Sequence, residues 1–290
     1  MPNINAPRQN SPAWNPPASQ DTRWTELPLL TVSSVGDLLG CSKKYDELRV
    51  KKRWPKGRKP PPVTVPRGSA WHETLRALHA ARWTDENGVC HLPMSDLEGY
   101  AESAVMAARY GRDVDRALEV QHVMGMARLF VENQDPEDIA DGVIVALETQ
   151  VEFDYYFKGE ALARIGATID RVLIRPDLPG VIVVQDYKST RQVINLAECF
   201  LLIWCAAKKW PGYDYVLELI WVDAEDGTVT NDVISADMVR KQHKIITTAL
   251  LKRLTTPPVA ESGPACTFCP LRDSCQGLPA VDLVEDELPF

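Results

Sequence analysis

The chain has 290 residues, of which 45% are hydrophobic and 25% are charged, as in an ordinary soluble globular protein. Its length allows one large domain or two small ones. No apolar run approaches the length of a membrane span and no secretory signal is visible at the N-terminus, so we expect neither a membrane protein nor an exported one, and we predict a cytoplasmic location. The seven cysteines, an odd number in such a chain, argue against a disulfide scaffold.

Positive charge is concentrated in one segment near the N-terminus. Residues 41–60 hold nine Lys and Arg residues against two acidic residues, a net charge of +7, and because the whole chain carries −8, the remainder carries −15. A basic segment on an acidic body indicates a local contact with a polyanion, although a solvated, highly charged helix end is the alternative. The side chains that we expect to make this contact are Lys43, Lys44, Lys51, Lys52 and Arg53.

The first half of the chain has the pattern of helices. Residues 1–28 are rich in Pro, Asn, Ser and Gln, lack periodicity and are expected to be disordered. A helix is expected after Ser33 or Ser34, and a Pro- and Lys-rich linker is expected over 55–66. Further helices are expected over 70–83, with Ser69 as the N-cap, and over 94–110 and 114–132.

The second half of the chain changes to the period of β-strands. Strands are expected over 143–156, 163–174, 181–187, 213–222 and 228–235, with helices over 196–208 and 236–254. These elements predict the α/β class, with a mixed β-sheet flanked by helices. The expected organisation is one domain over 29–280, made of a helical part over 29–140, a core over 141–254 and a cysteine-bearing loop over 255–280, followed by an acidic tail over 281–290.

The stretch 163–187 is interpreted as a β-hairpin that brings charged side chains together. Its strands flank a turn that contains two prolines and a glycine. With the turn centred near Asp177, Asp170 lies opposite Gln185 or Asp186, and Asp170, Asp186 and Lys188 can share one face of the sheet. Two carboxylates suit Mg²⁺ or Mn²⁺, and a lysine beside them can polarise water for attack on a phosphate. An Asp-x-Lys pattern also occurs by chance, so it is a weak signal by itself.

Three cysteines near the C-terminus follow the pattern C-x₂-C-x₅-C, formed by Cys266, Cys269 and Cys275. Soft thiolates of this kind select zinc or an iron–sulfur cluster, and three local ligands with a distant fourth favour [4Fe–4S] over zinc. Cys41 is the best candidate for the fourth ligand, because it lies near a predicted helix break. The predicted site is a structural staple between the two ends of the chain.

Four features occur together and in order along the chain. They are Gly68-Ser-Ala-Trp-His72, Gly166-Ala-Thr-Ile-Asp170-Arg171, Val183-Val-Gln-Asp186-Tyr-Lys188, and the cysteine tail with Cys41 upstream. In this combination the sequence resembles the PD-(D/E)XK nuclease superfamily, and within it the RecB-type branch, where the Cas4 exonucleases and the AddB nuclease domain carry an iron–sulfur staple. The resemblance implies a restriction-endonuclease-like core with a C-terminal iron–sulfur staple.

The resemblance also implies a role for each matching residue. His72, Asp170, Asp186 and the backbone carbonyl of Tyr187 would bind Mg²⁺ or Mn²⁺, and Asp170, Asp186 and Lys188 would form the catalytic set, in which Lys188 orients the attacking water. The cysteines at 41, 266, 269 and 275 would hold [4Fe–4S], with zinc as the alternative. The family usually continues with Q-x-x-x-Y on the next helix, and here Glu198 is the candidate replacement for the Gln in positioning the substrate.

The expected function is therefore a metal-dependent DNA exonuclease of Cas4/RecB type that acts on single-stranded DNA ends. Recombination, repair, CRISPR adaptation and phage DNA metabolism are all compatible settings, and proteins of recombination or CRISPR adaptation are the expected partners besides DNA. Two alternatives remain open. One is a DNA-end-binding or assembly module with a vestigial nuclease site, and the other is an iron–sulfur redox sensor.

Overall fold

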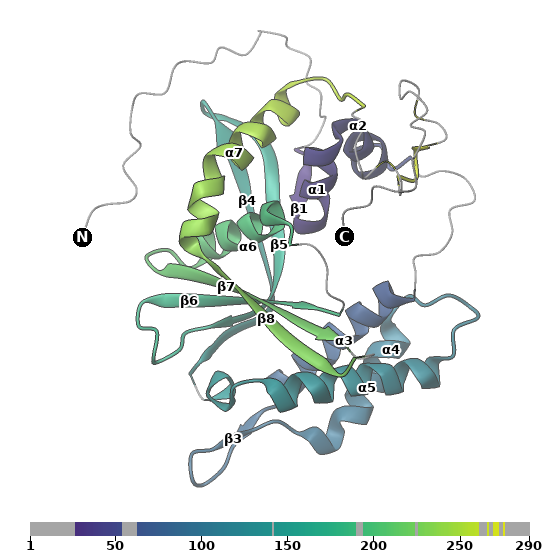
Figure 1. The fold of residues 1–290 in the computed structure, drawn as a ribbon, viewed down its shortest axis with the longest axis vertical. Coiled ribbons are helices and arrows are strands. Elements are labelled where there is room, and N and C mark those ends of the chain that lie inside the picture. The colour runs from purple at the N-terminus through teal and green to yellow at the C-terminus, as the bar shows by residue number, and fades with distance from the viewer. Residues whose placement is uncertain are drawn as a thin grey trace.

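The structure is a computed structural model that describes residues 27–53, 63–140, 142–189, 194–223 and 226–260, together with 266, 269–272 and 275 (Figure 1). The expected disordered segment falls almost wholly, and the acidic tail wholly, outside these described residues. No helix within the described ranges is long and apolar enough to cross a membrane.

The part of the chain before the main strands is mostly helical, as the sequence predicts. Its elements are β1 (Leu29–Thr31), α1 (Val32–Gly40), α2 (Ser42–Tyr45), a π-helical turn η1 (Asp46–Val50), α3 (Thr64–Ala80), a small hairpin of β2 (Trp83–Thr84) and β3 (Cys90–His91), the 3₁₀ turn η2 (Met94–Asp96), α4 (Leu97–Ala107), α5 (Arg116–Asn133) and the 3₁₀ turn η3 (Pro136–Ile139). The short strands β1, β2 and β3 were not expected from the sequence.

The remaining elements form a mixed sheet with two more helices. They are β4 (Ile144–Phe157), β5 (Glu160–Leu173), β6 (Val181–Lys188), α6 (Leu196–Lys209), β7 (Asp214–Asp223), β8 (Thr228–Ser235) and α7 (Ala236–Thr255). The strand order is β1-β5-β6-β7-β8, with β4 also pairing with β5. Strands β4, β5 and β6 are successively antiparallel, β6 and β7 are parallel, and β7 and β8 are antiparallel. The predicted mixed sheet flanked by helices, of restriction-endonuclease-like type, is confirmed.

Helices cover both faces of the sheet. Figure 1 shows α1, α6 and α7 on one side of the β6–β8 strands and α3, α4 and α5 on the other. Side chains of a strand alternate between the two faces, and β6 follows this rule: Ile182 and Val184 pack with α6 and α7, whereas Tyr187 packs with Trp71 and Phe130 of α3 and α5. Asp186 and Lys188 therefore belong to the α6 side of β6.

Two predicted helix starts are wrong. Helix α1 begins at Val32 with Thr31 as its N-cap, so Ser33 and Ser34 lie in its first turn, where the hydroxyl of Ser34 accepts from the N–H of Thr31 at 2.8 Å. Threonine is itself a common N-cap residue, and the sequence did not distinguish it from the two serines.

Helix α3 begins at Thr64, within the expected linker, so Ser69 is an interior residue whose hydroxyl donates to the carbonyl of Val65 and is not the N-cap. The cause is Pro66, which we interpreted as part of a linker. Proline is tolerated in the first turn of a helix, where its missing N–H would have no partner within the helix.

Strand β5 shares one of its edges between two neighbours. Its residues Arg164–Gly166 pair in parallel with β1, and its residues Arg171–Leu173 pair antiparallel with β6. A side chain at Gly166 would meet Leu29 of β1 and Glu152 of β4 at 3.2–3.3 Å, so the glycine permits this close approach. Asp170 lies between the two pairings, where its carboxylate accepts a hydrogen bond from the backbone N–H of Tyr187 at 2.6 Å. The fork in the sheet thus fixes the position of Asp170.

Candidate functional site

Three carboxylates form a row across β4, β5 and β6. The pairs Leu147–Arg171 and Thr149–Ile169 place Glu148 opposite Asp170, and continuation of the Arg171–Gln185 pair places Asp170 opposite Asp186. The hairpin therefore adopts one of the two registers that its turn predicted. Asp170 and Asp186 are buried and Glu148 is half-buried, so their charges are held close together in a region of reduced hydration.

His72 reaches this row from α3. Its Nδ1 lies 3.2 Å from Oδ1 of Asp170 and 3.5 Å from Oε1 of Glu148, and its Nε2–H donates to the backbone carbonyl of Tyr187 at 3.1 Å. His72, Glu148 and Asp170 bring one ligand atom each to within 4.8 Å of one another, and no other group of three His, Cys, Asp or Glu residues does so within the described ranges. The structure thus gathers His72 and Asp170 as the sequence predicted, and adds Glu148.

The contacts of His72 show that this point favours a positive charge. Nε2 carries the proton that is donated to the carbonyl of Tyr187, so in a neutral ring Nδ1 has no proton. Its lone pair would then face the carboxylate oxygens of Asp170 and Glu148, which is a repulsive contact. Burial lowers the pKa of His72, but the carboxylates of Asp170 and Glu148 raise it more strongly, to about 10. Either a second proton or a cation therefore satisfies Nδ1 and the two carboxylates.

Asp186 and Lys188 form a second contact next to this group. The ammonium of Lys188 lies 2.8 Å from Oδ2 of Asp186. Burial and the neighbouring carboxylate of Asp170 raise the pKa of Asp186 to about 6, although Lys188 opposes the shift. Burial also lowers the pKa of Lys188, but Asp186 and Asp170 raise it more, so the ammonium form is retained. Asp186 is thus electrostatically part of the site, while its carboxylate is directed at Lys188.

The donor set fits a hard divalent cation such as Mg²⁺ or Mn²⁺. Carboxylate oxygens, a carbonyl oxygen and an imidazole nitrogen are ligands that these ions accept in proteins. The row offers three carboxylates, from Glu148, Asp170 and Asp186, which Lys188 and a protonated His72 contact. Arg76, whose charge also acts on Glu148, is paired with Glu73. A group of like charges without enough counter-charge is the arrangement that a bound cation stabilises.

Glu148 is the site residue that sequence reasoning missed. It lies inside a continuous strand, and nothing in the surrounding sequence marks it as a ligand. Its φ of 41° is in the left-handed region, which is unfavourable for a glutamate in a strand. Burial raises the pKa of its carboxyl group, while the contact with His72 opposes the shift.

Glu198 lies at the beginning of α6, close to the carboxylate row. Its Oε1 accepts a hydrogen bond from the side-chain amide of Asn195, the N-cap of α6, at 3.1 Å. Burial raises the pKa of Glu198, and its charge acts on Lys188. The residue expected to replace the family's glutamine therefore lies within electrostatic range of Lys188.

The cysteines belong to two different environments. Cys199 and Cys205 are buried in the core side of α6, where burial raises both thiol pKa values to about 12, so these two are packing residues. Cys41 caps α2, and its sulfur accepts the backbone N–H of Lys44 at 3.4 Å. Burial raises the pKa of Cys269, and Cys41 and Cys266 also act on its charge. Cys41 and Cys266 therefore each lie within electrostatic range of Cys269.

Contacts between α2 and the segment after α7 hold this region together. The backbone N–H of Lys43 donates to the carbonyl of Val259, and the hydroxyl of Ser42 accepts from the N–H of Val259 at 3.0 Å. The N-terminal and C-terminal parts of the domain therefore meet beside Cys41. Cys275 is tied to Arg272 by a backbone hydrogen bond, and Arg272 is tied in the same way to Cys269.

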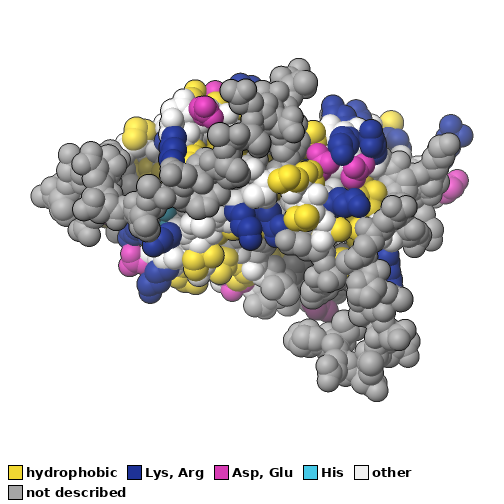
Figure 2. All heavy atoms as spheres, turned by 90° about the horizontal axis from the view of Figure 1, so that it is seen from above, with side chains coloured by type: hydrophobic (Ala, Val, Ile, Leu, Met, Phe, Trp, Pro, Cys, Tyr) yellow, Lys and Arg dark blue, Asp and Glu magenta, His cyan; other side chains and the backbone are white. Residues whose placement is uncertain are grey.

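In the described part of the basic segment, residues 41–53, four of the Lys and Arg side chains form ion pairs with nearby acidic residues. Lys44 and Arg49 both contact Asp37, while Lys51 and Arg53 contact Glu47. On the face drawn in Figure 2, the coloured Lys and Arg side chains lie in several groups, some of them next to Asp and Glu side chains. Of the five predicted DNA contacts, Lys44, Lys51 and Arg53 are ion-paired, so their charge is partly neutralised before DNA binds.

Comparisons with known proteins place the chain in a family. No curated protein matches it with significant sequence similarity. Among solved structures, the crystal structure of SSO0001 is similar, with a TM-score of 0.41 and 11% sequence identity over 88% of this chain and 89% of that chain, a likeness too weak to carry an argument. The family model described as PD-(D/E)XK nuclease superfamily matches residues 29–276. Because that match covers far more than half of the sequence and includes every residue of the site described above, the chain belongs to the PD-(D/E)XK nuclease superfamily, whose members use divalent metal ions.

Proposed function

We propose that this protein is a metal-dependent DNA exonuclease of Cas4/RecB type, with single-stranded DNA ends as its substrate. The observation that carries the proposal is the convergence of His72, Glu148 and Asp170 within 4.8 Å, next to the Asp186–Lys188 pair. Membership of the superfamily implies nuclease activity in general. The exonuclease mode and the preference for single strands rest on the resemblance to the RecB-type branch.

In the proposed mechanism, His72, Glu148, Asp170 and Asp186 hold the divalent cation. Bound there, Mg²⁺ or Mn²⁺ supplies Lewis acidity toward a phosphate oxygen and lowers the pKa of water. Lys188 orients the attacking water and stabilises negative charge on the phosphate, and Asp186 fixes the position of the ammonium group at 2.8 Å. The carbonyl of Tyr187, which accepts from His72, is the further oxygen ligand that the family pattern implies.

Substrate positioning is proposed for two regions next to the row. Glu198 would act near Lys188 in the role that glutamine has in the family. The segment with Lys43, Lys44, Lys51, Lys52 and Arg53 would contact phosphates, and its binding would weaken as salt rises. We place the reaction in the cytoplasm, in recombination, repair, CRISPR adaptation or phage DNA metabolism, with proteins of those processes as partners.

A structural [4Fe–4S] cluster held by Cys41, Cys266, Cys269 and Cys275 is part of the proposal. The support is chemical: four thiolates come from the two ends of the domain, and the sulfur of Cys41 already accepts a backbone N–H, a contact that stabilises a thiolate. Zinc is the alternative occupant. A brown protein with visible absorbance that is lost on oxidation, together with iron rather than zinc by elemental analysis, identifies the cluster.

The experiment that tests the proposed activity uses anaerobically purified full-length protein with Mn²⁺ and linear or circular single-stranded DNA. We expect loss of the linear substrate only, abolished in Asp186→Ala and Lys188→Ala and retained in Asp177→Ala, an exposed aspartate in the same hairpin. Cutting of circles would make the protein an endonuclease. Binding of DNA ends without cleavage under any metal would instead support the vestigial end-binding module.

A further inference from the structure

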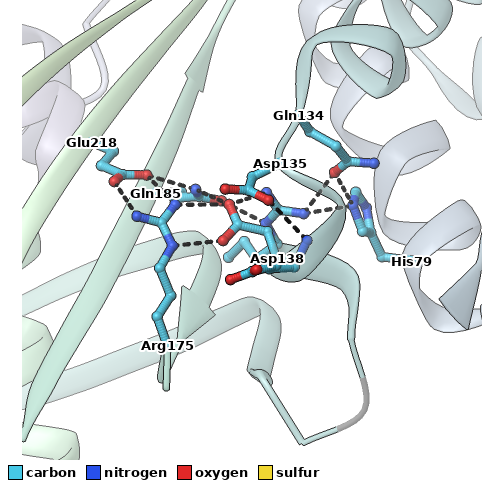
Figure 3. Close-up of polar contacts among 9 residues, drawn as sticks. His79, Gln134, Asp135, Asp138, Arg175, Gln185 and Glu218 are labelled. Carbon is cyan, nitrogen blue, oxygen red and sulfur yellow. Dashed lines mark hydrogen bonds and ion pairs between the residues drawn. The ribbon is translucent and has the colours of Figure 1, made fainter. Parts of the chain in front are cut away.

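A buried polar network lies between α3–α5 and the sheet (Figure 3). At its centre Arg171 of β5 donates from Nε to Oε1 of Gln185 at 2.5 Å and from Nη1 to Nε2 of His79 at 2.7 Å and to Oε1 of Gln134 at 3.1 Å. Gln185 in turn donates to Oε2 of Glu218 at 2.7 Å. The side chain of Arg171 is fully buried, so this network belongs to the interior.

The outer part of the network joins Arg175 to two acidic residues. Arg175 donates to both carboxylate oxygens of Asp138, at 2.6 and 2.8 Å, and to both of Glu218, at 2.7 and 3.1 Å. The two arginines and the two acids balance one another in charge. Burial and the adjacent Arg171 lower the pKa of His79 to about 3, so its imidazole is neutral and accepts the hydrogen bond from Arg171.

Two residues of the network, Arg171 and Gln185, are each adjacent in sequence to a carboxylate of the row described above. Arg171 follows Asp170 on β5, and Gln185 precedes Asp186 on β6, so each points to the side of its strand opposite to that of the neighbouring carboxylate. His79 follows His72 by seven residues on α3, which places both on one side of the helix, about 10.5 Å apart along its axis. Each of the three elements therefore carries one site residue and one network residue.

We propose that Arg171, Gln185 and His79 are positioning residues for the metal site, an inference that rests on the proposed nuclease function. The Arg171–Gln185 hydrogen bond fixes the register of β5 and β6, on which the opposition of Asp170 and Asp186 depends. The Arg171–His79 hydrogen bond fixes the rotation and translation of α3, on which the reach of His72 depends.

Hydrogen bonds can fix the strand register and the position of α3 more specifically than apolar packing does. A slip of one residue between two strands moves every side chain to the other face, and apolar side chains of similar size tolerate such a slip better than a directional bond does. Buried ion pairs are seldom more stabilising than apolar residues of the same volume, so their value here is in specifying one arrangement. The guanidinium of Arg171 also lies 5.8 Å from the centre of the ring of Tyr187. The backbone carbonyl of Tyr187 accepts a hydrogen bond from His72, so Arg171 also contacts a residue that holds His72.

The test measures Mn²⁺ binding to the full-length protein by electron paramagnetic resonance, for wild type, Arg171→Met and Arg67→Met. Arg67 is the matched control, because it is a half-buried arginine on the same α3 helix that forms a bidentate pair with Glu119 of α5 at 2.7 and 2.8 Å. We expect Arg171→Met to weaken Mn²⁺ binding about tenfold and to change the spectrum of the bound ion, as removal of supporting contacts does at metal sites. Arg67→Met should keep the wild-type affinity and spectrum.

Two results would overturn the proposal: a folded Arg171→Met protein with wild-type Mn²⁺ affinity, or an equal loss in Arg67→Met, which would mark a general loss of stability. If Arg171→Met does not fold, His79→Phe is the second variant, since it keeps an aromatic ring against Phe130 and removes the acceptor of Arg171, together with the hydrogen bond from Nδ1 to the carbonyl of Leu75 within α3. An altered spectrum with weaker binding in that variant supports positioning, and unchanged binding overturns it. Wild-type protein that binds no Mn²⁺ would instead refute the proposed function itself.

Discussion

The carboxylate row and the buried polar network use neighbouring residues of β5 and β6, yet they differ in how their charges are compensated. In the network, the guanidinium of Arg175 is bonded to the carboxylates of Asp138 and Glu218. In the row, Glu148, Asp170 and Asp186 exceed the positive charge that Lys188 and a protonated His72 supply, and the pKa of Asp186 is raised to about 6 by burial and by Asp170. The charges of the network are therefore balanced within the protein, whereas those of the row are not.

This difference separates structural from functional polar residues. A closed set of buried charges specifies the fold, and removing one member leaves its partner uncompensated. An open set of like charges destabilises the protein without its ligand, and such unfavourable arrangements are retained where they bind or react with something. The same kind of substitution, a carboxylate changed to its amide, should therefore have opposite consequences in the two sets.

The largest expected effect is on activity, from Asp186→Asn. Loss of this carboxylate removes a proposed metal ligand and the partner of Lys188, so we expect the cleavage rate to fall by about 10³-fold or more. The free energy of unfolding of the metal-free protein should not fall, because one of three repelling charges has been removed. Single-turnover cleavage and urea denaturation check both parts. A large loss of stability with the loss of activity would place Asp186 among the structural residues, and Asp177→Asn in the hairpin turn should change neither.

The next effect is on stability, from Asp138→Asn. This change leaves Glu218 as the one remaining carboxylate that balances Arg175 and Arg171 in the network. We expect the free energy of unfolding to fall by about 3 kcal/mol. Urea denaturation at pH 7 measures this change in the free energy of unfolding. Glu137→Gln, at the exposed neighbouring position of the same 3₁₀ turn, should stay within about 0.5 kcal/mol of wild type. Equal effects of the two substitutions would show that the network is not a closed set.

The sequence was sufficient for the parts of the site that depend on local geometry. The turn between β5 and β6 is short and rich in proline, so residue counting placed Asp170 opposite Gln185 or Asp186, and the structure has the second of these registers. Long, clearly periodic strands and helices were likewise predictable. The boundary of α3 was missed because Pro66 has the same appearance in a linker and in the first turn of a helix. The three-residue strand β1 is too short for any period to be visible.

Glu148 shows why the rest of the site could not be found. The strands β4 and β5 are joined by Lys158 and Gly159, both with positive φ, and counting back from this tight turn places Glu148 opposite Ile169. An irregularity between Tyr155 and Tyr156 shifts the pairing by one residue, and the actual partner is Asp170. The contacts of Arg171 with His79 and Gln134 were equally hidden, since their partners are 92 and 37 residues away.

A smaller effect is expected from Glu148→Gln, which tests whether the third carboxylate belongs to the open set. The amide keeps the size of the side chain and one oxygen near His72, but it removes a charge. We expect Mn²⁺ affinity to fall about tenfold, less than for a loss of Asp170, and stability in the absence of metal to rise slightly. Titration with Mn²⁺ measures the affinity, and urea denaturation without metal measures the stability. Unchanged affinity would exclude Glu148 from the ligands, and Glu160→Gln, exposed at the start of β5, is the matched control.

The last prediction concerns the closed set and its dependence on pH. The pKa of His79 is about 3 in the folded protein, through burial and Arg171, and about 6.5 in the unfolded chain. Between these values the unfolded chain binds the extra proton, so the contribution of His79 to stability is complete above pH 6.5 and is lost as pH falls toward 3, by at most about 1.4 kcal/mol per pH unit. Urea denaturation of wild type and His79→Phe from pH 7.5 to 4.5 isolates this contribution. Stability of wild type should fall more steeply below pH 6.5 than that of the variant, because only the wild-type chain gains a proton at position 79 when it unfolds. Parallel curves would mean that the imidazole accepts a proton within the fold, and the network would then open in acid.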